Sequence, residues 1–198
     1  MTDPYRNCPS FENDNYLLRL VEAHDAADLL HVYSDDKAVP LFNGDNCHGD
    51  DFHYTTLERM QSAVDFWVQS YHEKWFVRWT IVDCRTQQAI GTIELFNRQA
   101  QDYFNDCGLL RLDLRSDYEQ AQHLYDILTL IVPPAYTMFN CKMIAIKVPP
   151  FASERRKAVQ KLGFVLSQEA LIGSNDGISY TDYYVLFCAI TPTKLCGS

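Results

Sequence analysis

Residues 107 to 164 read CGLLRLDLRSDYEQAQHLYDILTLIVPPAYTMFNCKMIAIKVPPFASERRKAVQKLGF, and this stretch decides the fold of the chain. Leucines alternate with charged residues in its first part, Cys107 to Arg115, which is typical of a strand buried on one face. We then expect a helix from near Asp117, a strand from Lys142 to Val148, and a helix capped at its end by Gly163. This order of elements predicts a sheet covered by helices.

The segments on either side supply the rest of the sheet. A capping box at Thr55 and Glu58 predicts a helix of about five turns after the long polar connection 34 to 54. Pro133 and Pro134 are expected to kink or interrupt the helix that begins near residue 117. The other predicted elements are strand Tyr16 to Val21, helix His24 to Tyr33, hairpin strands Trp75 to Asp83 and Ala89 to Asn97, and closing strands Phe164 to Glu169 and Tyr180 to Ala189.

Together these elements predict an α+β fold. We expect a mixed, mostly antiparallel central sheet of about seven strands flanked by about four helices. A length of 198 residues with 47% hydrophobic residues suits one domain, residues 1 to 198, with a sizeable core. Its ends, residues 1 to 14 and 190 to 198, are expected to be loosely held.

Composition limits the partners and the compartment. The formal net charge of -9 and a pI near 5.0 argue against nucleic acid and favour cationic or amine-bearing ligands. Seven cysteines without a CxxC pair indicate reduced thiols. The N-terminal residues carry no apolar signal, and no apolar run approaches a membrane span. We therefore expect a cytoplasmic protein that contacts neither nucleic acid nor membrane.

Three segments carry a resemblance to a known family: YLLRL at 16 to 20, AIGTIELF at 89 to 96, and KAVQKLGF at 157 to 164. With the order of elements, they resemble the GNAT N-acetyltransferases, particularly the branch that acetylates ribosomal proteins. The likeness covers residues 16 to 187. It implies an enzyme that transfers an acetyl group from acetyl-CoA to an amine of a small molecule or protein, as a monomer or homodimer.

The resemblance also implies where acetyl-CoA binds. In that family the cofactor lies between the two central strands, and its pyrophosphate is held by amides of a Gly-rich turn. The corresponding turn here, Arg115 to Gln120, contains no glycine. Ser116 and Glu119 form a capping-box pattern that can occupy these amides. The expected cofactor-binding residues are Asp113, Leu114, Arg115, Ser116, Arg155 and Arg156.

This departure from the family pattern leaves a second function open. Two carboxylates in the first turn would repel a pyrophosphate, although an acidic residue there stabilises the helix itself by about 0.3 to 1 kcal/mol. The alternative is a non-catalytic module of the same fold, with weakened or lost CoA binding, that acts by binding a ligand or a partner.

Acetyl transfer to an amine needs a proton acceptor and a proton donor. Glu94, on a central strand, is the candidate general base; its structural alternative is an ion pair with Arg111 or Arg115. Tyr118 is the candidate acid; its alternative is a packing role at a helix start. Asp113 alternates with arginines and could equally belong to a ladder of charges.

The acidic connection between the first two helices is the candidate acceptor site. Asp45, Asp50 and Asp51 would attract a cationic amine. The segment also contains histidines and Cys47, but no spacing matches a metal site, so we expect no bound metal. A solvated acidic loop is the simpler interpretation of the same residues.

Overall fold

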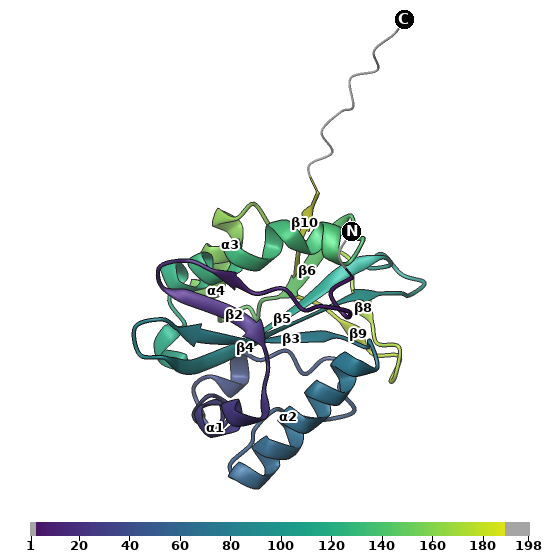
Figure 1. Ribbon diagram of the computed structural model, residues 1–198. Helices are drawn as coiled ribbons and strands as arrows, with labels where there is room; N and C mark the ends of the chain where they lie inside the picture. The colour runs from purple at the N-terminus through teal and green to yellow at the C-terminus, as the bar shows by residue number, and fades with distance from the viewer. Residues whose placement is uncertain (1–2, 189–198) are drawn as a thin grey trace, which may run out of the picture.

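The computed structural model describes residues 3 to 188, and an eight-stranded sheet runs through the middle of the molecule (Figure 1). Its strands are β1 (Phe11–Glu12), β2 (Tyr16–Leu20), β3 (Val77–Asp83), β4 (Gln88–Arg98), β5 (Cys107–Leu114), β6 (Met143–Lys147), β7 (Val165–Leu166) and β10 (Tyr183–Phe187). They are arranged in the order β1-β2-β3-β4-β5-β6-β10-β7. A separate hairpin pairs β8 (Leu171–Ile172) with β9 (Ser179–Tyr180). The predicted α+β fold is confirmed, with β1 and this hairpin as additions.

Two pairs of helices cover the two faces of the sheet (Figure 1). The helices are α1 (Ala26–Tyr33), α2 (Leu57–His72), α3 (Ala121–Met138) and α4 (Ser153–Lys161). Apolar side chains of α3 and α4 pack with one face of the sheet in one core cluster. Those of α1 and α2 form a second cluster on the other face. The candidate site lies on the α1 and α2 face.

Strands β5 and β6 separate partway along their length. Among the described residues, 3 to 188, β5 and β6 are the two neighbouring strands of the large sheet that run parallel. Their residues pair from Cys107 with Met143 to Leu110 with Ile146. A side chain at Gly108 would lie 2.6 Å from Ile144 Cδ1, so glycine permits this close approach. Strand β5 continues unpaired on this side to Leu114. The two strands therefore diverge from Arg111 onward, and we call this opening the splay.

The alternation of β5 separates an apolar face from a charged face, as predicted. Leu110, Leu112 and Leu114 are buried in the core cluster beneath α3. Asp113 instead accepts a hydrogen bond from the hydroxyl of Tyr33 in α1, at 2.8 Å. The charged face of β5 therefore points towards α1 and α2.

Two predicted helix starts are wrong by a few residues. Helix α2 is capped by Thr56, which accepts from the Arg59 amide at 3.2 Å, so the box predicted at Thr55 does not form. Helix α3 begins at Ala121 after a 3-10 turn at Ser116–Tyr118. The capping box predicted at this turn is absent because the Glu119 side chain binds another helix instead. At α2 a neighbouring residue supplies the cap, whereas at α3 a tertiary contact replaces the local capping pattern.

Two further predictions concern the proline pair within α3 and the end of α4; the first is wrong about an interruption and the second is confirmed. Helix α3 runs through Pro133 and Pro134 to Met138 without interruption. Helix α4 ends as predicted, since Gly163 has a φ of +94°, a conformation that glycine adopts without strain. The tertiary packing of α3 on the sheet outweighs the missing amides of the two prolines.

The N-terminal segment is held by specific contacts. Phe11–Glu12 pairs with β2 as an edge strand. The Trp79 indole donates to the Pro9 carbonyl at 2.8 Å, and the Tyr71 hydroxyl donates to the Pro4 carbonyl at 3.2 Å. Residues 3 to 14 therefore differ from the loosely held end that the sequence predicts; the expectation for 190 to 198 lies outside the described residues. Across residues 3 to 188, none of the helices combines the length and apolar character needed to cross a membrane.

Candidate functional site

A cavity of about 460 Å³ lies over β3, β4 and β5, beside α2 and the connection from α1 to α2. We call it the acceptor-side cavity. Its aromatic lining residues are Phe52, Tyr54, Phe66, Trp67, Trp75 and Phe76. The residues that carry a charge at neutral pH are Asp50, Arg59, Arg78, Glu94 and Arg111. A concave site with apolar walls and a few converging polar groups is the usual form of a small-molecule pocket.

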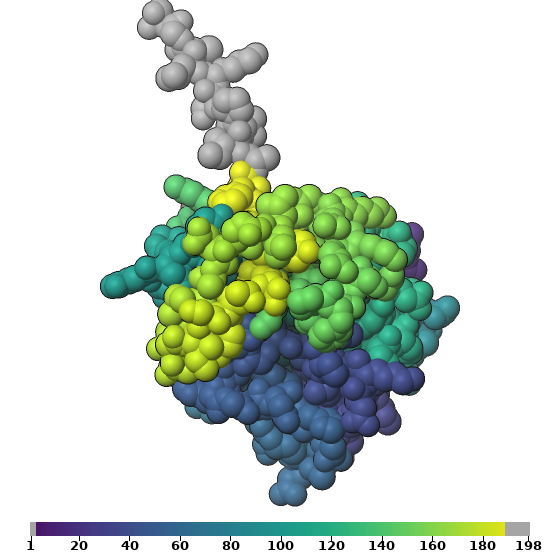
Figure 2. All heavy atoms as spheres, turned by 180° about the vertical axis from the view of Figure 1, so that it is seen from behind, coloured from purple at the N-terminus to yellow at the C-terminus, as the bar shows by residue number. Residues whose placement is uncertain are grey.

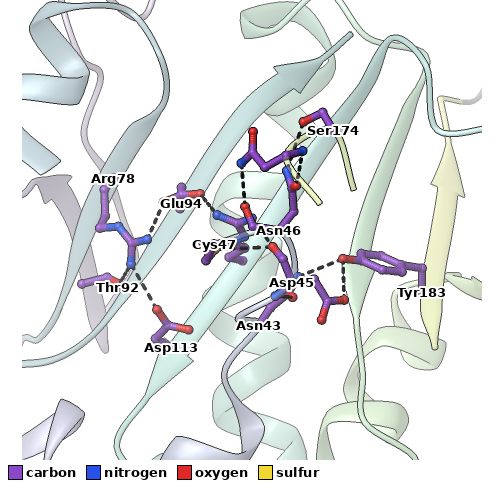
Figure 3. Close-up of polar contacts among 12 residues, drawn as sticks. Asn43, Asp45, Asn46, Cys47, Arg78, Thr92, Glu94, Asp113, Ser174 and Tyr183 are labelled. Atoms are coloured by element: carbon purple, nitrogen blue, oxygen red, sulfur yellow. Dashed lines mark hydrogen bonds and ion pairs between the residues drawn. The ribbon is translucent and has the colours of Figure 1, made fainter. Parts of the chain in front are cut away.

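The floor of the acceptor-side cavity is a row of charged side chains across three strands. Arg78 of β3 lies opposite Glu94 of β4, and Glu94 lies opposite Arg111 of β5. Both carboxylate oxygens of Glu94 accept hydrogen bonds, Oε2 from Arg78 and Oε1 from Arg111 Nη1 at 2.7 Å (Figure 3). The Arg78 and Glu94 side chains are 1% and 2% exposed. The row is therefore a buried ion triad.

Arg78 is also the centre of a network beneath the row. Its Nη1 donates to Asp113 at 3.1 Å and to Thr92 at 2.9 Å (Figure 3). The Tyr33 hydroxyl donates to the same Asp113 oxygen at 2.8 Å. The guanidinium carbon lies 4.2 Å from the centre of the Trp67 ring. Asp113 thus belongs to a ladder of charges, which was the alternative to its predicted role in cofactor binding. Its carboxylate binds Arg78.

The triad determines the protonation of Glu94. Burial acts to raise the pKa of this carboxyl, but the charges and hydrogen bonds of Arg78 and Arg111 outweigh it and hold the pKa below its usual value of 4.5. A carboxylate with a lowered pKa is a weak proton acceptor. With both oxygens bound to guanidinium groups, Glu94 does not fit the predicted role of general base and matches its structural alternative.

The connection from α1 to α2 occupies the splay between β5 and β6 at Asp45. Lys147 Nζ at the end of β6 lies 2.6 Å from both carboxylate oxygens of Asp45. The Tyr183 hydroxyl donates to Asp45 at 3.1 Å, and Asn43 donates to that hydroxyl at 3.2 Å (Figure 3). Arg111 Nη2 donates to the Asp45 carbonyl at 3.0 Å. Asp45 therefore joins the two diverging strands and does not face solvent as an attractor of cations.

The hairpin of β8 and β9 holds the next residue of this loop. The Asn46 side chain donates to Ser174 Oγ at 3.1 Å and accepts from the Asn175 amide at 2.7 Å. Figure 2 shows the yellow-green segment that contains the hairpin against the blue segment of the α1 to α2 connection. Asn46, His48 and Phe52 have φ values of 59°, 54° and 57°. Such left-handed residues are uncommon outside glycine and persist where surrounding contacts hold them.

Several amides of the turn that would hold a pyrophosphate are occupied. The Ser116 amide donates to the Asp35 carboxylate at 2.9 Å. The Ala121 amide, the first of α3, donates to Glu154 of α4 at 3.1 Å. The Glu119 amide donates to the Ser116 carbonyl at 3.2 Å. Two carboxylates, Asp35 after the end of α1 and Glu154 of α4, thus bind amides that an anionic ligand would need.

The basic residues near this turn are also paired. Arg155 is 3% exposed and binds Glu119 through Nε and Nη2, and its Nη1 donates to the Leu41 carbonyl at 2.8 Å. Arg115 binds Asp117 at 2.7 Å. In this arrangement the turn does not fit a pyrophosphate, because the Ser116, Glu119 and Ala121 amides and both arginines already have acidic or carbonyl partners.

The remaining predicted cofactor residues are divided between core and surface. Leu114 is completely buried in the core cluster below α3, so its side chain is not presented to a ligand. Arg156 on α4 is partly exposed. The structure therefore does not bring the six predicted cofactor residues together as one set of donors.

Tyr118 lies in a different cavity from Glu94. This second cavity, about 290 Å³, is also lined by Tyr16, Asp83 and His123. The Tyr118 hydroxyl donates to Asp83 at 2.6 Å. Burial and this hydrogen bond raise its pKa. The two candidate catalytic residues, Glu94 and Tyr118, therefore line separate cavities, because the turn directs the phenol to the α3 side of the sheet.

The other acidic residues of the predicted acceptor loop have separate surroundings. Asp50 lines the acceptor-side cavity, where it accepts from Arg59 and from the Tyr54 hydroxyl, each at 2.9 Å. Asp51 is exposed, and its carboxylate accepts from the His53 amide at 3.0 Å. The three predicted acceptor aspartates therefore do not form one negative patch, since Asp45 and Asp50 are neutralised by cations.

Sequence reasoning missed Arg78 and the aromatic walls. The signal was present, because Arg78 is a cation flanked by Val77 and by Trp79 to Val82 in the strand VRWTIVD. An arginine at such a position requires carboxylate partners. The aromatic walls combine Phe66 and Trp67 of α2 with Trp75 and Phe76 after it. Phe66 was the available signal on α2, since it is an aromatic residue that is 49% exposed and lies outside the buried stripe of that helix.

The thiols and possible metal ligands carry no further site. Cys8, Cys47, Cys84, Cys107 and Cys141 are free thiols. Burial raises the pKa of the Cys47 thiol to about 11, so that thiol is protonated at neutral pH. Among residues 3 to 188, no group of three histidine, cysteine or carboxylate side chains is placed to hold a metal ion.

No protein-family model and no curated protein sequence matches the chain. Solved structures do match it. The ribosomal-protein-S5-alanine acetyltransferase from Vibrio fischeri has a TM-score of 0.66 at 19% identity, over 89% of this chain and 94% of that one. RimJ from Mycobacterium smegmatis, in complex with CoA-disulfide, has a TM-score of 0.67 at 14% identity, over 89% and 84%.

A third structure, a GNAT acetyltransferase from Bacillus anthracis, has a TM-score of 0.65 at 11% identity, over 90% of this chain and 98% of that one. Identities at this level speak for architecture and leave activity to be argued from the site. The resemblance found in the sequence is confirmed at that level: the chain has the fold of the GNAT acetyltransferases, ribosomal-protein acetyltransferases among them.

Proposed function

We propose that the chain is an acyl-CoA-dependent N-acetyltransferase that acts on an amine of a small molecule or protein. The observation that carries the proposal is the splay. Strands β5 and β6 diverge from Arg111, and the same residue lines the acceptor-side cavity of about 460 Å³. A cofactor entering from the splay and an acceptor in the cavity would meet at this point. The GNAT-like fold supports this arrangement.

The likeness to RimJ, solved with CoA-disulfide, supports acetyl-CoA as the acyl donor. The chain's own residues must then rearrange before the donor binds. The loop around Asp45 must leave the splay, and Asp35 and Glu154 must release the turn amides that they occupy. We propose a cytoplasmic protein, acting as a monomer or homodimer, in which these contacts keep the donor site closed until acetyl-CoA is present.

The roles of individual residues follow from the contacts. We propose that Glu94 acts as a positioning residue that holds Arg78 and Arg111 at the cavity floor, because its two oxygens bind their guanidinium groups. Tyr118 stabilises the start of α3 through Asp83. Neither residue is proposed to transfer a proton.

A second candidate function is a non-catalytic module with the same fold. The closed turn favours it, because Arg155 and Arg115 are neutralised by Glu119 and Asp117. In this alternative the acceptor-side cavity binds a ligand without acetyl transfer.

Binding of the donor separates the two functions. For the enzyme, acetyl-CoA at about 1 mM should raise the melting temperature by mass action, and calorimetry should give a dissociation constant. Glu119→Gln should strengthen this binding because it frees Arg155, whereas the exposed control Glu169→Gln should not change it. Absence of a thermal shift and of binding heat with acetyl-CoA would exclude the enzyme and leave the binding module.

A further inference from the structure

The floor of the acceptor-side cavity contains two donors without partners. The Nε atoms of Arg78 and Arg111 are buried and make no hydrogen bond with any part of residues 3 to 188. Both side chains line the cavity, and that of Arg78 is 1% exposed. Native structures pair more than about 90% of buried polar groups. Two orphan donors in one cavity floor indicate that a ligand oxygen accepts from them.

The charges of the lining select the sign of that ligand. Three arginines, Arg59, Arg78 and Arg111, line the cavity with two carboxylates, Asp50 and Glu94. A third carboxylate, Asp113, pairs with Arg78 beneath the floor, so the formal charges balance. Both carboxylates already accept from arginines. The lining therefore leaves no carboxylate for a cation, whereas the Nε donors of Arg78 and Arg111 remain without acceptors. A carboxylate is favoured there, and an ammonium group would meet no unoccupied anion.

The walls select an apolar body. Phe66 and Trp75 are 49% and 55% exposed at the cavity, with ring centres 6.2 Å apart, and Phe66 lies equally far from Phe76. The faces of Tyr54 and Trp67 are already covered by Arg59 and Arg78. The walls therefore do not offer a free aromatic cage for a cation, but they offer rings against which an apolar group can pack.

We propose that the acceptor-side cavity binds a small carboxylate with an aromatic or branched apolar body. The carboxylate accepts from Arg78 and Arg111, and the body lies against Phe66, Trp75 and Phe76. As a statement about the acceptor, this rests on the proposed acetyltransferase function and identifies the acceptor as an apolar α-amino acid. An α-amine next to that carboxylate lies at Arg111, where the splay begins. Carboxylate binding to the cavity does not depend on the proposed acetyl transfer, so it is tested without acetyl-CoA.

Intrinsic fluorescence provides the test, because Trp67 and Trp75 line the cavity and the chain has three tryptophans. The full chain is titrated with L-phenylalanine, 3-phenylpropionate and 2-phenylethylamine, which share a phenyl body and differ in carboxylate and amine. L-phenylalanine and 3-phenylpropionate should bind at least about tenfold more tightly than 2-phenylethylamine. Equal or tighter binding of 2-phenylethylamine would overturn the proposal, as would no binding of either carboxylate.

Two variants separate the floor from the walls. Arg111→Lys keeps a positive charge beside Glu94 but removes the orphan Nε donor, so carboxylate affinity should fall about tenfold with little change for 2-phenylethylamine. Phe66→Ala should weaken all three probes, and its exposure makes misfolding a small concern. The control Leu57→Ala removes a similarly exposed apolar side chain of α2 that is outside the cavity lining, and should leave affinity unchanged.

The result is independent of the donor test. If L-phenylalanine binds and acetyl-CoA does not, the cavity proposal stands and the acetyltransferase proposal fails. If acetyl-CoA binds and neither carboxylate does, the reverse holds. Carboxylate affinity that is unchanged in both Arg111→Lys and Phe66→Ala would assign binding to another surface and overturn the proposal.

Discussion

At the residue scale, Glu94 joins the two arginines of the cavity floor. A carboxylate buried between two guanidinium groups offsets the cost of burying both cations. The same contacts remove its capacity to accept a proton. Glu94 thus fits a structural role and not that of a general base, because its neighbours across the sheet are arginines.

Glu94→Gln tests this structural role. The neutral amide leaves Arg111 without a carboxylate partner and Arg78 with Asp113 alone, so we expect a loss of about 3 to 5 kcal/mol in the free energy of unfolding. Urea denaturation at pH 7 measures it. The control Glu12→Gln changes an exposed glutamate on an edge strand of the same sheet and should cost little. A loss for Glu94→Gln no larger than that of the control would show that the charge is dispensable.

The stability of the chain should fall in acid. For each of five carboxyls, burial acts to raise the pKa, but hydrogen bonds, joined by arginine charges at all of them except Asp35, outweigh it and lower the pKa: Asp25, Asp35, Asp83, Glu94 and Asp102. A lowered folded-state pKa contributes stability that is present above the usual values of 3.8 and 4.5, and that is lost as pH falls through the folded pKa. Urea midpoints should therefore be nearly constant from pH 7 to about 5 and decrease below about 4. Midpoints that stay constant or rise in that acidic range would contradict these shifts.

At the element scale, the turn between β5 and α3 is closed by acidic residues from two other elements. Asp35, beyond the end of α1, takes the Ser116 amide, and Glu154 of α4 takes the Ala121 amide. A local capping box was not needed, because tertiary contacts supply the acceptors. This closure is the main obstacle to a phosphate ligand.

Opening the turn should therefore raise donor affinity. In the double variant Asp35→Asn with Glu154→Gln, weaker acceptors hold the two amides and two negative charges are removed, so we expect several-fold tighter binding of acetyl-CoA by calorimetry. The control Asp36→Asn neutralises an adjacent residue that is 89% exposed in its side chain. Equal affinity changes in the control and the double variant would mean that net charge, and not the turn, limits binding.

The β8 and β9 hairpin holds the α1 to α2 connection in place through hydrogen bonds to Asn46. Asn46→Ala removes the side-chain bonds to Ser174 and Asn175 and leaves a residue at a φ of 59° that alanine adopts at a cost of about 1 to 2 kcal/mol. Hydrogen exchange of residues 43 to 47 and 171 to 180 should become faster. Asn46→Gly removes the same bonds without the backbone strain, so it should be more stable than Asn46→Ala; the opposite order would exclude strain at this position.

At the scale of the whole molecule, the excess acidic charge lies outside the cavity floor, where arginines and carboxylates are paired. The net charge of -9 destabilises the compact state by self-repulsion. Salt screens surface charges much more than it screens buried pairs such as Arg78 and Glu94.

The melting temperature should accordingly rise between about 10 and 200 mM sodium chloride at pH 7.5. Differential scanning calorimetry at constant protein concentration measures the shift. A fall in melting temperature over this range would mean that exposed ion pairs stabilise the chain by more than its net charge destabilises it.

The sequence by itself determined the fold, because that information is local. Alternation in β5, the glycine after α4 and the order of elements each follow from a few neighbouring residues. Tertiary structure alone decided the site. The partner of Ser116 is 81 positions away, and the carboxylate that neutralises Arg155 is 36 positions away. Such pairings depend on which elements become neighbours, so an acidic turn and a general base in the sequence became a closed turn and a buried ion triad in the molecule.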